Sequence, residues 1–142
     1  MPETPDALVQ PEPQKPASGG NAAKAVLVSI AAWLVPGLGH LLLRKWGRAA
    51  IFFAGVAALA VAGLLLRGNV FSPEGDDPFA TLGFLADAGS GIFYFISRSI
   101  EAAGPDVSRA AGDYGTRFFA TAGVLNLLCA LDAHEIARGR KT

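Results

Sequence analysis

Two histidines, with a carboxylate close to one of them, are the residues whose types suit a metal ion. His40 lies in an apolar stretch, whereas Asp132 and His134 lie close together near residue 142. Imidazole nitrogens and carboxylate oxygens are common zinc ligands, so a zinc site would form if these segments met in space. The spacing matches no fixed zinc motif, and an interfacial polar cluster explains the same residues. We therefore expect no metal, cofactor or catalytic site, with a metal-dependent intramembrane enzyme as a remote alternative.

Asp87 and Asn126 are polar residues within otherwise apolar stretches. A carboxylate near the middle of a bilayer costs about 2.5–3.5 kcal/mol on insertion scales, and intramembrane acids commonly have a function. If its segment enters the bilayer, Asp87 is expected to pair with Arg117, Asn126 or His40. If the segment is interfacial, Asp87 faces water instead. In the first case Asp87 and Asn126 would line the path of a small transporter or ion-conducting oligomer.

The composition points away from a soluble protein and from several kinds of site. Of the 142 residues, 51% are hydrophobic and 17% charged, against about 25% charged in soluble domains. Twelve basic residues balance twelve acidic ones, which argues against a nucleic-acid partner. The single cysteine excludes an internal disulfide and any multi-cysteine metal site. Ser29, Ser90 and Cys129 have no histidine beside them in sequence, so no nucleophile–base set is visible.

The charge is unevenly distributed along the chain. Residues 1–23 contain five of the nine prolines and are predicted to be a disordered tail, followed by a helical membrane domain over 24–142. Residues 25–43 and 49–66 contain no charged side chain, and each is close to the roughly 20 residues that span a bilayer. A five-residue connector separates them, which predicts a tight antiparallel hairpin. A soluble core of this size could not bury both segments.

The first apolar segment is interrupted at Pro36, with Gly37 and Gly39 beside it. Proline removes a helical hydrogen bond and crowds the preceding turn. The helix therefore either kinks and continues to residue 43, or ends and is followed by an interfacial piece over residues 40–48. The connector suits the cytoplasmic interface, because tryptophan and basic side chains favour headgroups. Its interfacial residues are Arg44, Lys45, Trp46 and Arg48.

Small residues predict where helices pack in the membrane. In lipid, helices associate through close backbone approach and interhelical hydrogen bonds. In the second segment we expect another helix to dock on a stripe with a spacing of four residues, formed by Ala50, Ala54, Ala58 and Ala62. In the last segment a face with spacings of four, three and four is expected to point inward, formed by Ala122, Asn126, Cys129 and Ala133.

The predicted fold is all-α, with four hydrophobic helices of which three or four span the membrane. Residues 114–133 form the last span, and residues 79–97 are either spanning or re-entrant. The positive-inside rule places the basic connector in the cytoplasm and the acidic loop over residues 67–78 outside. The basic residues near the end of the chain favour a cytoplasmic C-terminus, which requires the third segment not to cross. Charge counting alone leaves that choice open.

Two stretches resemble a known family. Residues 33–40 (WLVPGLGH) with 44–49 (RKWGRA) are similar to the opening of a bacterial membrane-protein family, domain of unknown function 6677. The series NLL, DA, IA and GRK between residues 126 and 141 is similar to its end. The hairpin alone also resembles the two-transmembrane-domain family, which has a comparable glycine-rich turn with a histidine. The resemblance implies a bacterial membrane setting and no particular chemistry.

The function expected from the sequence is that of a non-enzymatic, multi-pass protein of the bacterial inner membrane. It would support or join a larger assembly, because small-residue faces are present and no catalytic set is visible. The expected partners are the lipid bilayer and either further copies of the chain or other membrane proteins.

Overall fold

The computed structural model describes residues 19–73, 77–100 and 110–141. Every regular element in these ranges is an α-helix, which confirms the predicted all-α class. Helix α1 begins before residue 24, so residues 19–23 are helical, whereas the rest of the predicted tail lies outside the described residues. The helices are α1 (Gly19–Leu34), α2 (Leu38–Leu42), α3 (Trp46–Leu65), α4 (Pro78–Ala88), α5 (Ile92–Ile100) and α6 (Ala110–Ala137).

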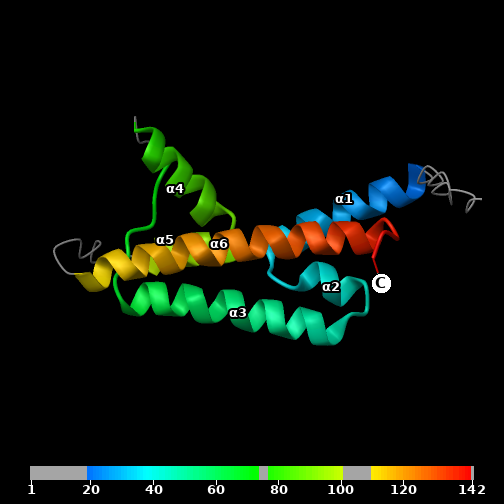
Figure 1. Cartoon of the computed structure of the whole chain (residues 1–142), viewed down its shortest axis with the longest axis horizontal. Coiled ribbons are helices and arrows are strands. Elements are labelled where there is room, and N and C mark those ends of the chain that lie inside the picture. The colour runs from blue at the N-terminus through cyan, green and yellow to red at the C-terminus, as the bar shows by residue number, and fades with distance from the viewer. Residues whose placement is uncertain (1–18, 74–76, 101–109, 142) are drawn as a thin grey trace, which may run out of the picture.

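Helices α3 and α6 form the centre of the molecule. They lie side by side and antiparallel, so the C-terminal end of α6 is close to the start of α3 (Figure 1). Both are long and apolar enough to cross a membrane. The 20 residues of α3 cover about 30 Å and the 28 residues of α6 about 42 Å. This pair therefore supplies two segments with the length of a bilayer span.

The first apolar segment is divided, as in the alternative in which the helix ends at Pro36 and does not continue to residue 43. Helix α1 ends at Leu34, just before Pro36. Gly37 then has a φ of 80°, and a Cβ there would overlap the carbonyl oxygen of Ala49. After this break α2 leads the chain back toward the end where α6 finishes (Figure 1). The hairpin around the connector is therefore formed by short α2 and the long α3, while α1 packs on α2 and α6.

The third apolar segment is also broken. The chain bends by 112° between helices α4 and α5, with Gly91 at a φ of 63° at the bend. Asp77 caps the start of α4 by accepting a hydrogen bond from the amide of Phe79 at 3.3 Å. Both outer ends of the pair lie away from the C-terminal end of the molecule (Figure 1). The pair is therefore either a broken span or a re-entrant loop, and we predict the re-entrant alternative from the position of its two outer ends.

The predicted alanine stripe on α3 does not pack within the chain. Ala50, Ala54 and Ala58 are exposed, and Ala62 is half-buried. The face that packs against α6 carries glycines instead. Gly63 lies under the ring of Phe119, and Gly55 lies beside Leu125. The missing side chains leave room for these larger residues of α6, which explains why α3 turns this face inward. Its buried residues are Ala49, Val56, Ala60 and Gly63.

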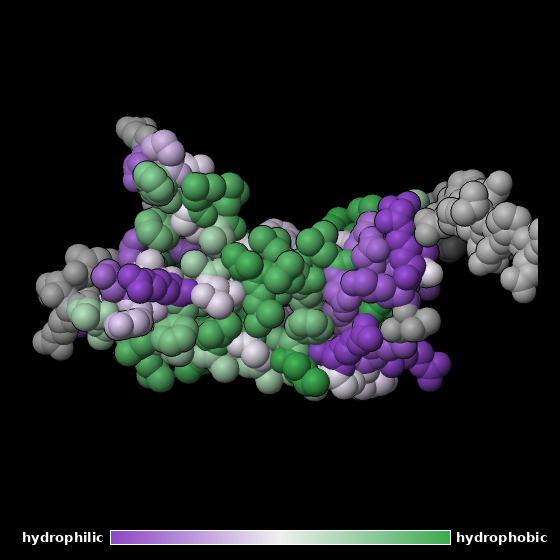
Figure 2. All heavy atoms as spheres, in the orientation of Figure 1, coloured by the Kyte–Doolittle hydropathy of each residue, from purple (hydrophilic) through white to green (hydrophobic). Residues whose placement is uncertain are grey.

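Polar and apolar surfaces are separated along the molecule. Figure 2 shows a hydrophilic surface at the end formed by the α2–α3 connector and the residues after α6, next to a hydrophobic middle. We call this the basic end, because it carries Arg44, Lys45, Arg48, Arg138, Arg140 and Lys141. The structure thus brings the two basic segments that the sequence singled out to the same end.

Candidate functional site

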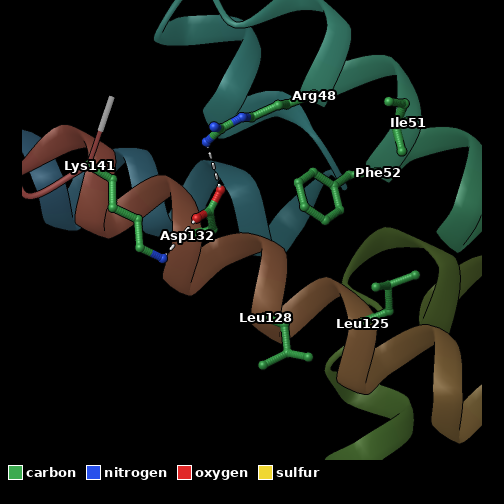
Figure 3. A pocket seen from close by; sticks show the side chains of 7 residues that line it. All are labelled: Arg48, Ile51, Phe52, Leu125, Leu128, Asp132 and Lys141. Atoms are coloured by element: carbon green, nitrogen blue, oxygen red, sulfur yellow. Dashed lines mark hydrogen bonds and ion pairs between the residues drawn. The ribbon is translucent and has the colours of Figure 1, made fainter.

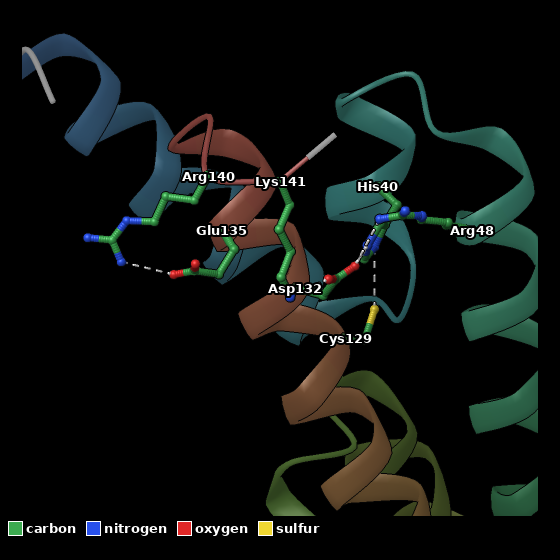
Figure 4. A network of polar contacts seen from close by, with 7 residues as sticks. All are labelled: His40, Arg48, Cys129, Asp132, Glu135, Arg140 and Lys141. Carbon is green, nitrogen blue, oxygen red and sulfur yellow. Dashed lines mark hydrogen bonds and ion pairs between the residues drawn. The ribbon is translucent and has the colours of Figure 1, made fainter. Parts of the chain in front are cut away.

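His40 connects α2 to α6 through both of its ring nitrogens. Its Nε2 lies 3.0 Å from Oδ2 of Asp132, and its Nδ1 lies 3.6 Å from Sγ of Cys129 (Figure 4). A carboxylate only accepts hydrogen bonds, so Nε2 donates to Asp132. In the neutral ring Nδ1 then accepts from the Cys129 thiol. The ring of Phe52, 4.9 Å away between centroids, packs against the imidazole.

The order thiol, imidazole and carboxylate is the one used by cysteine nucleophiles, where histidine takes the thiol proton and the carboxylate orients the ring. Here, however, Cys129 and His40 are both 0% exposed. A substrate therefore has no path to the sulfur in this structure. What the arrangement can do chemically is satisfy three polar side chains and tie α2 to the last third of α6.

Asp132 is the centre of a wider network at the basic end. Nη1 of Arg48 lies 3.4 Å from Oδ2 of Asp132, and Nζ of Lys141 lies 3.1 Å from Oδ1 (Figure 4). A separate pair joins Arg140 to Glu135 at 3.3 Å. The cationic side chains are about half exposed, so each ion pair contributes at most about 1 kcal/mol. Together they hold the end of the chain against the start of α3.

His134 lies apart from this network. Its Nδ1 is 2.9 Å from Oγ of Ser29, which itself donates to the carbonyl of Ala25. His134 therefore donates to the hydroxyl and links α6 to α1. The structure thus brings together His40 and Asp132 but not His134. Over the described ranges, no group of three or more His, Cys, Asp or Glu side chains is placed to hold a metal ion.

Asn126 lies where the two broken segments meet, a point that we call the central junction. Its Nδ2 donates to the carbonyl oxygen of Trp33 at 2.7 Å and to that of Gly89 at 2.8 Å. Nε1 of Trp33 also donates to the carbonyl of Ala88 at 3.1 Å. The C-terminal ends of α1 and α4 therefore converge on one amide of α6. Asn126 does bond to other helices, as expected, and it bonds to two of them.

Asp87 is only 1% exposed, so it does not face water as the interfacial alternative required. Its Oδ2 accepts a hydrogen bond from the backbone amide of Phe71 at 2.9 Å. The hydroxyl of Tyr94 donates to the carbonyl of the same residue at 3.2 Å. The segment between α3 and α4 is thereby attached to both α4 and α5.

Two features of these sites were not expected from the sequence. The first is the contact between Cys129 and His40. The sequence feature that could have indicated this contact is the three-residue spacing of Cys129 and Asp132, which places both side chains on one face of a helix. The second is the bond from Phe71 to Asp87. No residue type could have indicated it, because the donor is a backbone amide in a loop.

A groove of about 910 Å³ opens between α3 and α6 near the basic end. Figure 3 shows Arg48 and Lys141 on either side of Asp132, with the apolar side chains farther to the right along the two helices. The apolar lining consists of Ile51, Phe52, Leu125 and Leu128. This volume lies within the range of small-molecule sites, about 300–1,000 Å³.

Comparison with known proteins identifies the family. Neither the curated proteins nor the solved structures include a match. Residues 27–142 match a family of unknown function, DUF6677, which covers the helices from within α1 to the end of the chain. The chain therefore belongs to this family, as its motifs at the α1–α2 break and in α6 suggested.

Proposed function

We propose that this protein is a non-enzymatic subunit of a membrane assembly, held in the bacterial inner membrane with its basic end in the cytoplasm. The observation that carries the proposal is the exposed face of α3. Only 22% of its most apolar stretch is buried, and Ala54 and Ala58 lie opposite the face that packs on α6. Small residues on a lipid-facing helix allow a second helix to approach closely.

The buried polar side chains also support a structural role. Asn126 and Asp87 bond to backbone groups of neighbouring segments, so both contribute to holding the bundle together. The Cys129 thiol has no exposed surface. The orientation follows from the basic residues in the connector and after α6, because short basic segments remain in the cytoplasm.

Site-specific photocrosslinking in native membranes tests this proposal. A crosslinking residue in place of Ala54 or Ala58 should give one defined product of higher mass, from a second copy or another membrane protein. Leu131 is the matched control, since it is apolar and 62% exposed but lies on α6 and not on the alanine face of α3. The proposal would be contradicted if Leu131 gave crosslinked products in the same yield as Ala54 and Ala58. It would also be contradicted if the protein stayed monomeric, with no crosslinked product at any position.

A second candidate is a small transporter or ion-conducting oligomer. The observation that favours it is the central junction, where two broken helices meet on Asn126. Transporters commonly build their sites from such interrupted helices near the middle of the membrane. Cation flux into liposomes that contain the protein should then be lost in Asp87→Asn. It should be retained in Asp77→Asn, which removes an exposed carboxylate from the start of the same helix. Unchanged flux in Asp87→Asn would remove Asp87 from this role.

A further inference from the structure

The groove between α3 and α6 has different chemistry at its two ends. Near the basic end it is lined by Arg48, Lys141 and the carboxylate that they share, Asp132. The arginine and lysine side chains are 45% and 54% exposed, so they remain accessible from outside. At this end of the groove, which we call its mouth, the described lining residues include two cations and one anion, and Arg44 and Lys45 lie in the adjacent connector.

Away from the mouth the lining is apolar. Ile51 and Phe52 from α3 face Leu125 and Leu128 from α6. Leu128 is 57% exposed and Ile51 73% exposed, so this part of the groove is open along its side. Figure 2 shows that the surface changes from hydrophilic to hydrophobic between the basic end and the middle of the molecule. If the molecule spans a bilayer, the mouth is level with the headgroups and the rest of the groove with the acyl chains.

We propose that this groove binds one anionic phospholipid. The phosphate lies against Arg48 and Lys141, and an acyl chain lies along the apolar lining between α3 and α6. Basic pockets between membrane helices on the cytoplasmic side bind anionic headgroups through this charge complementarity. A zwitterionic lipid has the same chains but no net charge to match the mouth. The site is independent of the assembly role, since the groove lies between helices of a single chain.

Lipid binding to the purified full-length chain tests the proposal. Phosphatidylglycerol or phosphatidylcholine is added to the protein in a non-ionic detergent, and native mass spectrometry counts the bound molecules. The first phosphatidylglycerol should bind more tightly than the first phosphatidylcholine. Replacing both cations, Arg48→Gln with Lys141→Gln, should weaken phosphatidylglycerol binding by about 30-fold, since each cation near a membrane surface contributes about a factor of five. Phosphatidylcholine binding should remain unchanged.

Two further variants separate this site from general attraction to lipid. Arg98→Gln with Arg117→Gln removes two cations that lie outside the groove, and should leave phosphatidylglycerol binding at the wild-type level. Leu128→Trp fills the groove while keeping both cations, and should weaken the binding of both lipids. Equal affinity for the two lipids would overturn the proposal. An equal loss of phosphatidylglycerol binding in the two double charge variants would also overturn it. A third overturning result is wild-type lipid binding in Leu128→Trp, provided that this variant keeps the helical circular-dichroism signal.

Discussion

Asn126 satisfies two carbonyl groups that would otherwise have no donor. The last four carbonyls of an α-helix lack partners within that helix, and both α1 and α4 end inside the molecule. One side-chain amide bonds to Trp33 and to Gly89, so a single residue of α6 compensates for both breaks. A buried acceptor without a donor costs about 1–3 kcal/mol, which makes this position sensitive to substitution.

Asn126→Ala is therefore expected to lower the free energy of unfolding by about 1–2 kcal/mol. Unfolding in mixed detergent micelles, followed by circular dichroism, measures the change. Thr121→Ala is the control, because Thr121 is exposed on the same helix and its hydroxyl bonds only to the carbonyl of Arg117. An equal loss in the two variants would contradict the role of the central junction.

The Cys129 thiol should react slowly. It is fully buried and donates to His40, so a membrane-permeable maleimide should label the folded protein at a small fraction of the rate for the unfolded chain. Ala50→Cys combined with Cys129→Ala provides an exposed thiol for comparison, and it should react rapidly in the folded state. Fast labelling of native Cys129 would instead indicate an accessible nucleophile, and would reopen the question of catalysis.

Residue types and spacings could predict which side chains lie inside, but not all of their partners. The spacing of Asn126, Cys129 and Ala133 correctly places them on one buried face of α6. The same periodicity cannot reveal the contact between His40 and Cys129, because that contact depends on how the chain places α2 against α6 after the break at Pro36. Asp87 was identified as unusual because it is charged, yet the group that bonds to its Oδ2 is a loop amide without any sequence signature.

At the scale of the helices, glycines decide where close approach is possible. A Cβ at Gly123 would overlap the carbonyl oxygen of Ala86, so α4 and α6 are in contact there through backbone atoms. Gly55 on α3 is different, since its nearest neighbour would be Leu125 Cδ2 at 3.5 Å, an ordinary contact. Both glycines lie in apolar helices, so the effects of replacing each of them with alanine can be compared directly.

Gly123→Ala should destabilise the protein by about 2 kcal/mol or more, because the two backbones must separate. Gly55→Ala should be neutral or stabilising by up to about 1 kcal/mol, because alanine has the higher helix propensity and space for the methyl group is available. Unfolding in mixed micelles distinguishes them. Equal effects of the two substitutions would show that the approach of α4 to α6 is not critical.

The break after α1 could be predicted, but the course of the chain after it could not. Pro36 and Gly37 mark the end of α1, because proline disrupts the preceding turn and glycine adopts positive φ. Neither residue specifies the angle at which α2 leaves, which depends on packing against α3 and α6. The alanine stripe on α3 shows a related limit, since small residues occur on two faces of this helix and the sequence does not say which one meets α6.

At the scale of the whole molecule, the two broken pairs determine the topology. The α1–α2 pair lies at the basic end and the outer ends of the α4–α5 pair lie toward the other end, so among the described helices α3 and α6 alone run the length of the bundle (Figure 1). Charge counting left the side of the C-terminus open. The antiparallel packing of α3 and α6 returns the chain to the end where the basic connector lies, so we predict that the connector and the residues after α6 lie on the same side of the membrane.

Reporter fusions after residues 78, 104 and 142 test this topology. Fusions after 78 and 104 should both report the outer side of the membrane, because α4–α5 enters and leaves on one side. The fusion after 142 should report the cytoplasm, together with a reporter inserted in the basic connector. Opposite sides for positions 78 and 104 would mean that the third segment crosses, and would exclude the re-entrant arrangement.

The central junction also has a consequence for the order in which the protein is made. Both broken segments leave the ribosome before the helix that carries Asn126. During biogenesis the carbonyl groups of Trp33 and Gly89 therefore lack their hydrogen-bond donor until Asn126 has been synthesised. Insertion into the bilayer is therefore completed late, by α6. Nascent chains arrested before residue 126 should be cleaved by protease near Pro36 and Gly91. Chains arrested after α6 has left the ribosome should resist the same treatment.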